Sequence, residues 1–310
     1  MTAKRFVSCG ECMIEMAGGA DDHWKMGIAG DTLNTAWHFR NATAADDWHV
    51  RYVTALGDDR YSERIVKFIA DAGIDVSAIQ RLPGKRPGLY LIDQEDGDRV
   101  FTYWRENSAA RKMADDIASL ASAVRNANVI YLSGITLAIL GPDQRAAMID
   151  LLGDLSQHSR IAFDPNIRPA LWESPEVCAK IITEVAAISH IVLPSFDDEA
   201  KLFGDRSPEE TVMRYRDLGV AEVVVKNGSG PCTFSSNGSV TSINTPPASN
   251  VVDATGAGDS FNAAFLVTRL NGGKTLDAVK AAQALSAMVI QTHGALLRKG
   301  ENFQDGNLSE

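Results

Sequence analysis

Short runs of β-branched and other apolar residues alternate along the 310-residue chain with segments whose apolar residues recur at helical spacing. The β-rich runs are Phe6–Ser8, Val50–Thr54, Val129–Leu132, Ile161–Asp164, Ile191–Pro194 and Glu222–Lys226. The helical segments between them include Glu63–Ala72, Arg145–Leu155 and Glu209–Leu218. Strands that alternate with helices form βαβ units, which build a parallel sheet covered by helices on both faces. The sequence therefore predicts a doubly wound α/β domain with a mainly parallel sheet.

Two stretches, Met13–Ile28 and Gly88–Tyr103, break this alternation because each has the pattern of short strands with no helix between them. We expect these stretches, within residues 12–29 and 87–106, to form a small antiparallel β lid on the main domain. No linker rich in proline and serine divides the chain, so residues 1–310 are predicted to be one domain. The exposed edges of such a lid favour pairing with a second subunit, which predicts a homo-oligomer.

Charge and hydrophobicity exclude some classes of partner. The chain carries 30 Lys and Arg against 40 Asp and Glu, a formal net charge of -10. Such a surface repels a phosphate backbone and argues against nucleic acid, although a locally basic site can still bind a small anion. The N-terminal residues lack the apolar segment of a signal peptide, and no run of about 18 apolar residues occurs. We expect a cytoplasmic protein without membrane association.

The segment Asn250–Phe265 carries the clearest chemical signal. Gly256 and Gly258 come just before a run with helical spacing, and a glycine-rich helix N-terminus presents backbone N–H groups to an anion. Asp259 follows in the first turn, where an acidic residue often only stabilises the helix. Beside a glycine-built anion hole, the favoured interpretation is phosphoryl transfer. Gly256, Ala257 and Gly258 would stabilise the phosphoryl group while Asp259 accepts the proton of the attacking hydroxyl.

The run Asp253-x-Thr-Gly-Ala-Gly-Asp259 resembles the C-terminal signature of the ribokinase-like (PfkB-type) sugar kinases. Gly30-Asp31-Thr-Leu-Asn34-Thr-Ala is similar to their N-terminal sugar-binding signature, and the resemblance spans essentially the whole chain. It implies the ribokinase-like fold, Asp259 as catalytic base, and Gly30, Asp31 and Asn34 at the sugar. It also implies ATP and Mg²⁺ as cofactors and allows a monovalent cation. Capping of the following helix is the alternative role for Asn34.

Several further segments are most similar to the 2-keto-3-deoxygluconate kinases of that family. They are Gly10–Glu15, Gly30–Thr35, Pro87–Tyr90, Tyr103–Arg105, Leu132–Leu140 and Asp164–Trp172. The resemblance implies ATP-dependent phosphorylation of the 6-hydroxyl of 2-keto-3-deoxy-D-gluconate, in sugar-acid catabolism of the Entner–Doudoroff type. A related kinase for fructose, ribose or another keto-acid sugar stays open, as does a non-catalytic sugar-binding regulator. A regulator gains nothing from a catalytic base, so the retained Asp259 argues against the second alternative.

A sugar acid carries a carboxylate, which guanidinium groups bind with two parallel hydrogen bonds. The candidates are Arg105, at the end of a predicted lid strand, and Arg168, just after a strand end, where open α/β sheets bind ligands. A surface ion pair is the ordinary role of an arginine. Tyr90 and Tyr103 are expected to present hydroxyls to the sugar from the lid, with packing inside the lid as the alternative.

The predicted nucleotide contacts centre on Lys226, which ends a strand and leads into a glycine turn. This turn resembles the family's ATP loop, although an ordinary glycine hairpin has the same pattern. The expected cofactor contacts are Asn166, Arg168, Lys226, Gly228, Gly230, Gly256 and Gly258. The family's Asn-x-x-Glu motif, which positions Mg²⁺, lacks its Asn here, so Glu199 is left as the predicted indirect metal contact.

Overall fold

A mainly parallel sheet runs through the computed structural model, which describes residues 3–18, 23–95, 98–236, 238–248 and 250–297. In these residues the sheet has eight strands in the order β14-β13-β12-β11-β10-β9-β1-β4. Their bounds are β1 Lys4–Cys9, β4 Trp48–Val53, β9 Val129–Ser133, β10 Arg160–Asp164, β11 Ile191–Val192, β12 Glu222–Val225, β13 Cys232–Ser236 and β14 Ser239–Ile243. The pairs from β4 to β12 are parallel, while β12–β13 and β13–β14 are antiparallel. Each of the six predicted strands lies in this sheet.

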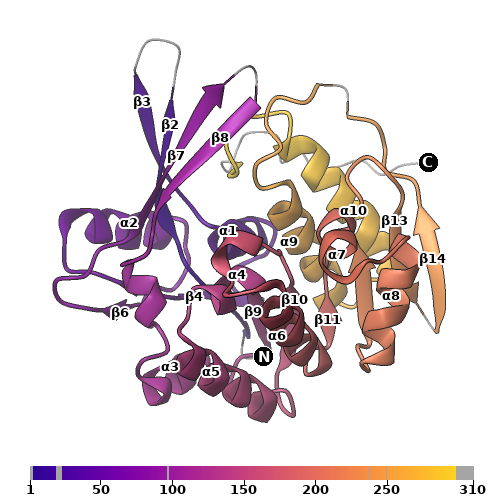
Figure 1. Ribbon diagram of the computed structural model, residues 1–310, viewed down its shortest axis with the longest axis horizontal. Helices are drawn as coiled ribbons and strands as arrows, with labels where there is room; N and C mark the ends of the chain where they lie inside the picture. Colours follow the sequence, from indigo (N-terminus) through magenta and orange to yellow (C-terminus); the bar gives the residue numbers. More distant parts are fainter. Residues whose placement is uncertain (1–2, 19–22, 96–97, 237, 249, 298–310) are drawn as a thin grey trace.

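Helices cover both faces of the sheet (Figure 1). One core contains side chains of α1 (Asp31–Asn41), α2 (Arg60–Asp71), α9 (Ala257–Leu270) and α10 (Thr275–Val289). The other contains side chains of α3 (Ile117–Val124), α4 (Gly134–Ala138), α5 (Pro142–Leu155), α6 (Pro175–Ala187), α7 (Phe196–Phe203) and α8 (Pro208–Asp217). Successive residues of a strand point to opposite faces, so Phe6 enters the first core and Val7 the second. The predicted doubly wound fold is confirmed.

The remaining elements are short. Two 3₁₀ helices span Ala109–Lys112 and Pro169–Leu171, and β5 (Ala55–Leu56) pairs with β6 (Gln80–Arg81). In the ranges that the structure describes, no helix combines the length and the apolar character needed to cross a bilayer.

The lid is a second, four-stranded sheet that projects from the main domain (Figure 1). It contains β2 (Met13–Gly18), β3 (Trp24–Ala29), β7 (Gly88–Glu95) and β8 (Asp98–Trp104), in the order β3-β2-β7-β8. The predicted small antiparallel sheet is confirmed for the pairs β2–β3 and β7–β8, whereas β2 and β7 join in parallel. Since the pattern within each stretch says nothing about how two stretches meet, the parallel junction was not predictable.

Candidate active site

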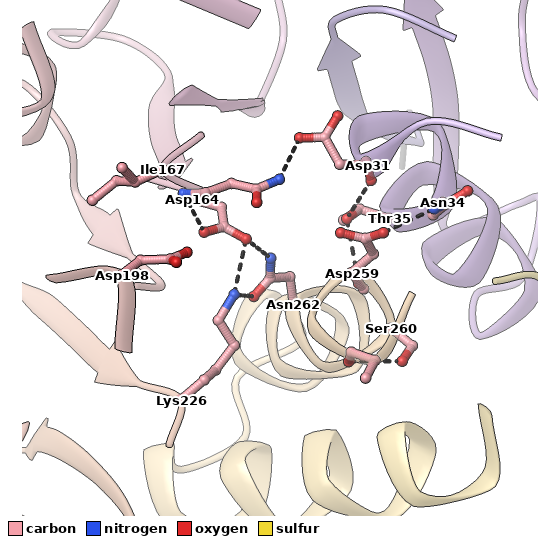
Figure 2. Close-up of polar contacts among 12 residues, drawn as sticks. Asp31, Asn34, Thr35, Asp164, Ile167, Asp198, Lys226, Asp259, Ser260 and Asn262 are labelled. Carbon is pink, nitrogen blue, oxygen red and sulfur yellow. Dashed lines mark hydrogen bonds and ion pairs between the residues drawn. The ribbon is translucent and has the colours of Figure 1, made fainter. Parts of the chain in front are cut away.

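Asp259 and Asn34 meet where the first turns of α9 and α1 lie side by side (Figure 2). The Asn34 amide nitrogen donates a hydrogen bond of 2.8 Å to Asp259 Oδ2. Its amide oxygen accepts a longer bond of 3.4 Å from the Gly30 backbone N–H, so Asn34 contacts both the carboxylate and the start of its own helix. Two residues 225 positions apart in the sequence thus hold one carboxylate in a fixed orientation.

Burial raises the pKa of Asp259 from 3.8 to about 7, and the negative charges of Asp31 and Asp164 act in the same direction. The hydrogen bond from Asn34 and the positive charge of Lys226 favour the ionised form and oppose part of this rise. A carboxylate that gains and loses its proton near neutral pH is suited to act as a general base.

Gly256 and Gly258 differ in what surrounds them. Gly256 precedes α9 with a φ of 77°, and a Cβ built on it would lie 2.6 Å from the Cβ of Ala295. A side chain is excluded there by both conformation and space. A Cβ on Gly258 would instead lie 3.5 Å from the Lys226 ammonium, an ordinary contact distance. In the first turn of α9 the Ala257 N–H donates to the Ala254 carbonyl at 3.2 Å, whereas the Gly258 N–H has no acceptor within the helix and is available to an anion.

A cavity of about 660 Å³ adjoins this helix end, in the size range of small-molecule sites. Its wall combines Lys226, Gly228, Ala257 and Gly258 with apolar side chains such as Phe261. The residues that line it are Ser195, Lys226–Ser229, Cys232, Thr245–Ala248, Val251, Ala254, Ala257, Gly258, Phe261, Gln283, Ser286, Ala287 and Ile290.

Gly230, also predicted to contact the cofactor, closes the turn behind the cavity. Its N–H donates to the Asn227 carbonyl at 2.7 Å, and a Cβ on it would lie 2.5 Å from the Asn227 side chain. Gly230 therefore shapes the turn, whereas Gly228 lies in the cavity wall.

Lys226 is held by a buried polar cluster. Its ammonium donates to Asp164 Oδ2 at 2.8 Å and to Asn262 Oδ1 at 3.2 Å (Figure 2). The Asn262 amide nitrogen donates in turn to Asp164 at 2.6 Å and to the Tyr131 hydroxyl at 3.0 Å. Asp164 and Asn262 were not predicted as site residues. Asp164 ends strand β10, and Asn262 lies one turn after Gly258 on the same face of α9, two signals that point to the site.

Asn166 turns back toward α1 immediately after β10. Its φ of 33° lies in the left-handed region, which is uncommon for a residue other than glycine. Its backbone N–H donates to Asp164 at 3.1 Å, and its amide donates to Asp31 Oδ2 at 2.7 Å. Asn166, predicted to contact the cofactor, is therefore hydrogen-bonded to Asp31, predicted to contact the sugar.

Arg168 lies two residues after Asn166. Its side chain is 51% exposed, and its Nη1 lies 3.4 Å from Asp198 Oδ2.

The lid places its two predicted tyrosines side by side, with ring centroids 5.7 Å apart. Tyr90 is buried and donates its hydroxyl to Glu15 within the lid, so packing inside the lid accounts for part of its environment. Tyr103 is 44% exposed. The guanidinium carbon of Arg105 lies 5.8 Å from the centre of the Tyr103 ring.

The Tyr103 hydroxyl is influenced by charged side chains from both the lid and the main domain. Burial raises the pKa of its hydroxyl, while the positive charges of Arg105 and Arg168 lower it and the negative charge of Asp31 raises it. These three residues come from β8's end, the segment after β10 and the start of α1. Arg105, Arg168 and Asp31 thus all act on the Tyr103 hydroxyl, where the lid faces the main domain.

Glu199, the predicted metal contact, lies in a different environment. Its carboxylate is buried and accepts hydrogen bonds from Arg214 at 2.7 Å and from the Tyr215 hydroxyl at 3.0 Å. Burial raises its pKa to about 7, with Arg214 acting in the opposite direction. Its neighbour Asp198 instead lies beside Asp164 and Lys226 (Figure 2). In the described ranges, no group of three or more His, Cys, Asp or Glu side chains is arranged to hold a metal ion.

Comparison with known proteins identifies a family and near full-length relatives. A family model described as pfkB family carbohydrate kinase matches residues 3–299. A 2-dehydro-3-deoxygluconokinase of Dickeya dadantii (strain 3937) is 39% identical over 306 residues, which cover 96% of this chain and 98% of the relative. The relative of the same name in Escherichia coli (strain K12) is 36% identical over 304 residues, covering 95% and 97%.

Solved structures share the fold. A PfkB protein from Polaromonas sp. JS666 superposes with a TM-score of 0.81 at 24% identity, covering 94% of this chain and 96% of that one. An Escherichia coli protein described as a ribokinase II, solved with ATP and Mg²⁺, gives a TM-score of 0.79 at 23% identity, covering 95% and 94%. At these identities the likeness establishes the fold.

Proposed function

This chain belongs to the pfkB family of carbohydrate kinases, and from that premise we propose that it transfers the γ-phosphoryl group of ATP to 2-keto-3-deoxy-D-gluconate. The product would be the 6-phosphate, formed in sugar-acid catabolism together with ADP. The near full-length relatives support this substrate. The observation that carries the proposal is the Asn34–Asp259 hydrogen bond, which fixes a carboxylate of near-neutral pKa beside a glycine-bounded helix N-terminus.

In the proposed reaction Asp259 accepts the proton of the 6-hydroxyl as the hydroxyl oxygen bonds to the γ-phosphorus. The bond from that phosphorus to the bridging oxygen breaks at the same time, and the electron pair leaves with ADP. The N–H groups at the start of α9, around Gly256, Ala257 and Gly258, stabilise the charge on the transferred group. Positioning and electrostatics do most of the work in phosphoryl transfer, which suits a site assembled from helix ends.

At the sugar end, Arg105 and Arg168 bind the carboxylate of the substrate and Tyr103 contacts its middle. Gly30, Asp31 and Asn34 hold hydroxyls, with Tyr90 supporting Tyr103 from within the lid. The proposal is supported by the combined influence of Arg105, Arg168 and Asp31 on the Tyr103 hydroxyl.

At the nucleotide end, ATP occupies the 660 Å³ cavity, whose apolar walls suit an adenine ring. Lys226 and Gly258 meet its phosphates, Gly228 lines its path and Gly230 keeps the turn in shape. Asn166 acts from the segment after β10 and links the two ends through Asp31.

Mg²⁺ is usually held in kinase sites by one or two carboxylates together with phosphate oxygens and water. Asp198 and Asp164 fit this requirement: burial raises the pKa of Asp198, and the charge of Asp164 adds to the rise. When bound, the ion neutralises charge on the phosphate oxygens. We assign it to Asp198 and Asp164, which lie beside Lys226 (Figure 2), and keep Glu199, whose carboxylate accepts hydrogen bonds from Arg214 and Tyr215, as the predicted indirect contact. A monovalent cation is part of the proposal, tested by activity in potassium against tetramethylammonium salts.

We further propose that two copies of the chain pair through the lid in the cytoplasm. Large apolar side chains are exposed on the described lid strands, namely Trp24, Val100, Phe101, Tyr103 and Trp104. Exposed apolar side chains on a sheet with free edges are typical of a surface that binds another chain. Trp104→Glu would then shift the mass measured by light scattering from dimer to monomer.

Use of ATP and four buried, unpaired cysteine thiols support a reducing compartment.

A coupled assay of ADP release over sugar acids and neutral sugars tests the proposed function. We expect kcat/KM for 2-keto-3-deoxy-D-gluconate to exceed that for fructose and ribose by at least about a hundredfold, since two guanidinium groups select a carboxylate. Equal values for the acid and for fructose would contradict the proposed substrate.

A further inference from the structure

Glu11 occupies the junction between the main domain and the lid. It lies two residues beyond β1 and is 2% exposed. A Cβ on Gly30 would lie 2.3 Å from the Glu11 carbonyl oxygen, and a Cβ on Gly88 would lie 3.0 Å from Oε1 of its side chain. The other side-chain oxygen, Oε2, forms an ion pair with Nη2 of Arg105. One residue thus contacts the start of α1 and the inner ends of two lid strands.

The Glu11–Arg105 pair is hard to explain by stability alone. Both side chains are almost fully buried, and removing two charges from water costs several kcal/mol per ion. The cost is best offset when the remaining polar atoms are also satisfied. Yet Glu11 Oε1 and Arg105 Nε have no hydrogen-bond partner among the described residues. Buried polar groups without a partner are uncommon in folded proteins, so these two atoms call for a reason.

The position of Arg105 supplies that reason. Its guanidinium lies against the Tyr103 ring, in the region where Arg168 and Asp31 also influence the Tyr103 hydroxyl. A guanidinium has five N–H donors, and Glu11 binds it at Nη2. The donors that remain suit a carboxylate, which needs two of them held in a fixed plane.

We propose that Glu11 is a positioning residue that fixes the Arg105 guanidinium through its Nη2 edge, so that the remaining N–H groups bind the substrate carboxylate. Glu11 therefore contributes to the preference for acids over neutral sugars without contacting the reacting atoms. This inference rests on the proposed function and adds to it a residue that ties substrate recognition to the base of the lid.

Steady-state kinetics of Glu11→Gln test the inference. Gln keeps the shape and removes the charge, so we expect KM for the sugar acid to rise about tenfold or more, while kcat and KM for ATP change less than about twofold. The kcat/KM for a neutral sugar such as fructose should stay within about twofold. Glu222→Gln is the matched control, since it weakens an arginine pair, with Arg269, at the opposite end of the sheet.

A double-mutant cycle separates positioning from a general structural role. If Glu11 acts through Arg105, Glu11→Gln should cause no further loss of kcat/KM for the acid in an Arg105→Met background. An additive loss, or an equal loss for acid and neutral sugars, would overturn the inference. Should Glu11→Gln not fold, Glu11→Asp carries the same cycle. A wild-type chain that phosphorylates no sugar acid refutes the proposed function instead, so the two failures are distinguishable.

Discussion

The two ends of the active site are built in different ways. The nucleotide end is a cavity with glycine and apolar walls, in which one cation, Lys226, is fixed by Asp164 and Asn262. The proposed sugar end consists instead of charged and aromatic side chains from the lid and main domain, some of them already paired, as in Glu11–Arg105. Asp259 lies between the two ends, held by Asn34 on the sugar side.

This difference has a functional meaning. A phosphate chain has the same charge in every kinase of this type, so backbone groups, a lysine and a metal ion can bind it without reading the identity of the sugar. Discrimination between sugars needs directional side chains, and these must be held in place before the substrate arrives. We therefore expect the lid residues to carry the specificity of this protein and the helix N-terminus to carry its chemistry.

The largest effect is expected at the residue that both ends share. Asp259→Asn removes the base and keeps the shape, so kcat should fall about a thousandfold or more while KM for each substrate changes only a few-fold. Asp277→Asn, an exposed acid in the first turn of α10, is the control. A variant with a tenth of wild-type turnover would show that proton acceptance by Asp259 is not required.

The next prediction separates fold from chemistry within the glycine run. Gly256→Ala forces a side chain into a left-handed backbone and against Ala295, so we expect a clear drop in Tm together with loss of activity. Gly258→Ala has room, so its Tm should stay within a few degrees while kcat falls about tenfold to a hundredfold because the methyl group crowds the phosphate path. Thermal denaturation and kinetics of both variants decide this. Equal losses of Tm would contradict the distinction.

The main sheet and the catalytic run were predictable because both are local. Buried parallel strands such as Val129–Leu132 are rich in apolar residues on both faces, and the glycines around Asp259 lie within a few residues of each other. Asp164 and Asn262 each carry a local signal, but their contact with each other around Lys226 was not predictable, because they are 98 positions apart and meet only in the folded chain.

The indirect metal role of Glu199 stays a prediction, and the structure adds contacts that the sequence does not indicate. Glu199 matches the position of an acid in a sequence motif, but its carboxylate is engaged by Arg214, fifteen residues later. Nothing in the local sequence indicates that Asp198, rather than Glu199, lies beside Asp164. Glu11 and Arg105 are 94 positions apart, so no local sequence pattern predicts their ion pair either.

A smaller effect is expected from the cluster that fixes the nucleotide-end cation. Asn262→Leu removes the acceptor for Lys226 and the donor to Asp164, which should raise KM for ATP about tenfold and leave KM for the sugar within twofold. Asn128→Leu, at the amino ends of the strands, controls for loss of an amide that accepts a backbone hydrogen bond, here from Arg5. An equal rise in both KM values would show that the two ends are not separable.

The smallest effect concerns the pH dependence of kcat. With the pKa of Asp259 at about 7, the protonated and inactive form accumulates below that pH, so kcat should decline from pH 8 to pH 6. Asn34→Leu removes a hydrogen bond to the ionised carboxylate of Asp259 and so favours the protonated form. The pH at which kcat falls to half on the acidic side should therefore rise by about one unit. Near pH 7 this amounts to a loss of only a few-fold, which disappears at pH 9. Because Asn34 is also proposed to contact the sugar, the pH dependence must be measured on kcat at saturating substrate. If the pH dependence of kcat is unchanged in Asn34→Leu, then Asn34 holds Asp259 in position without affecting its pKa.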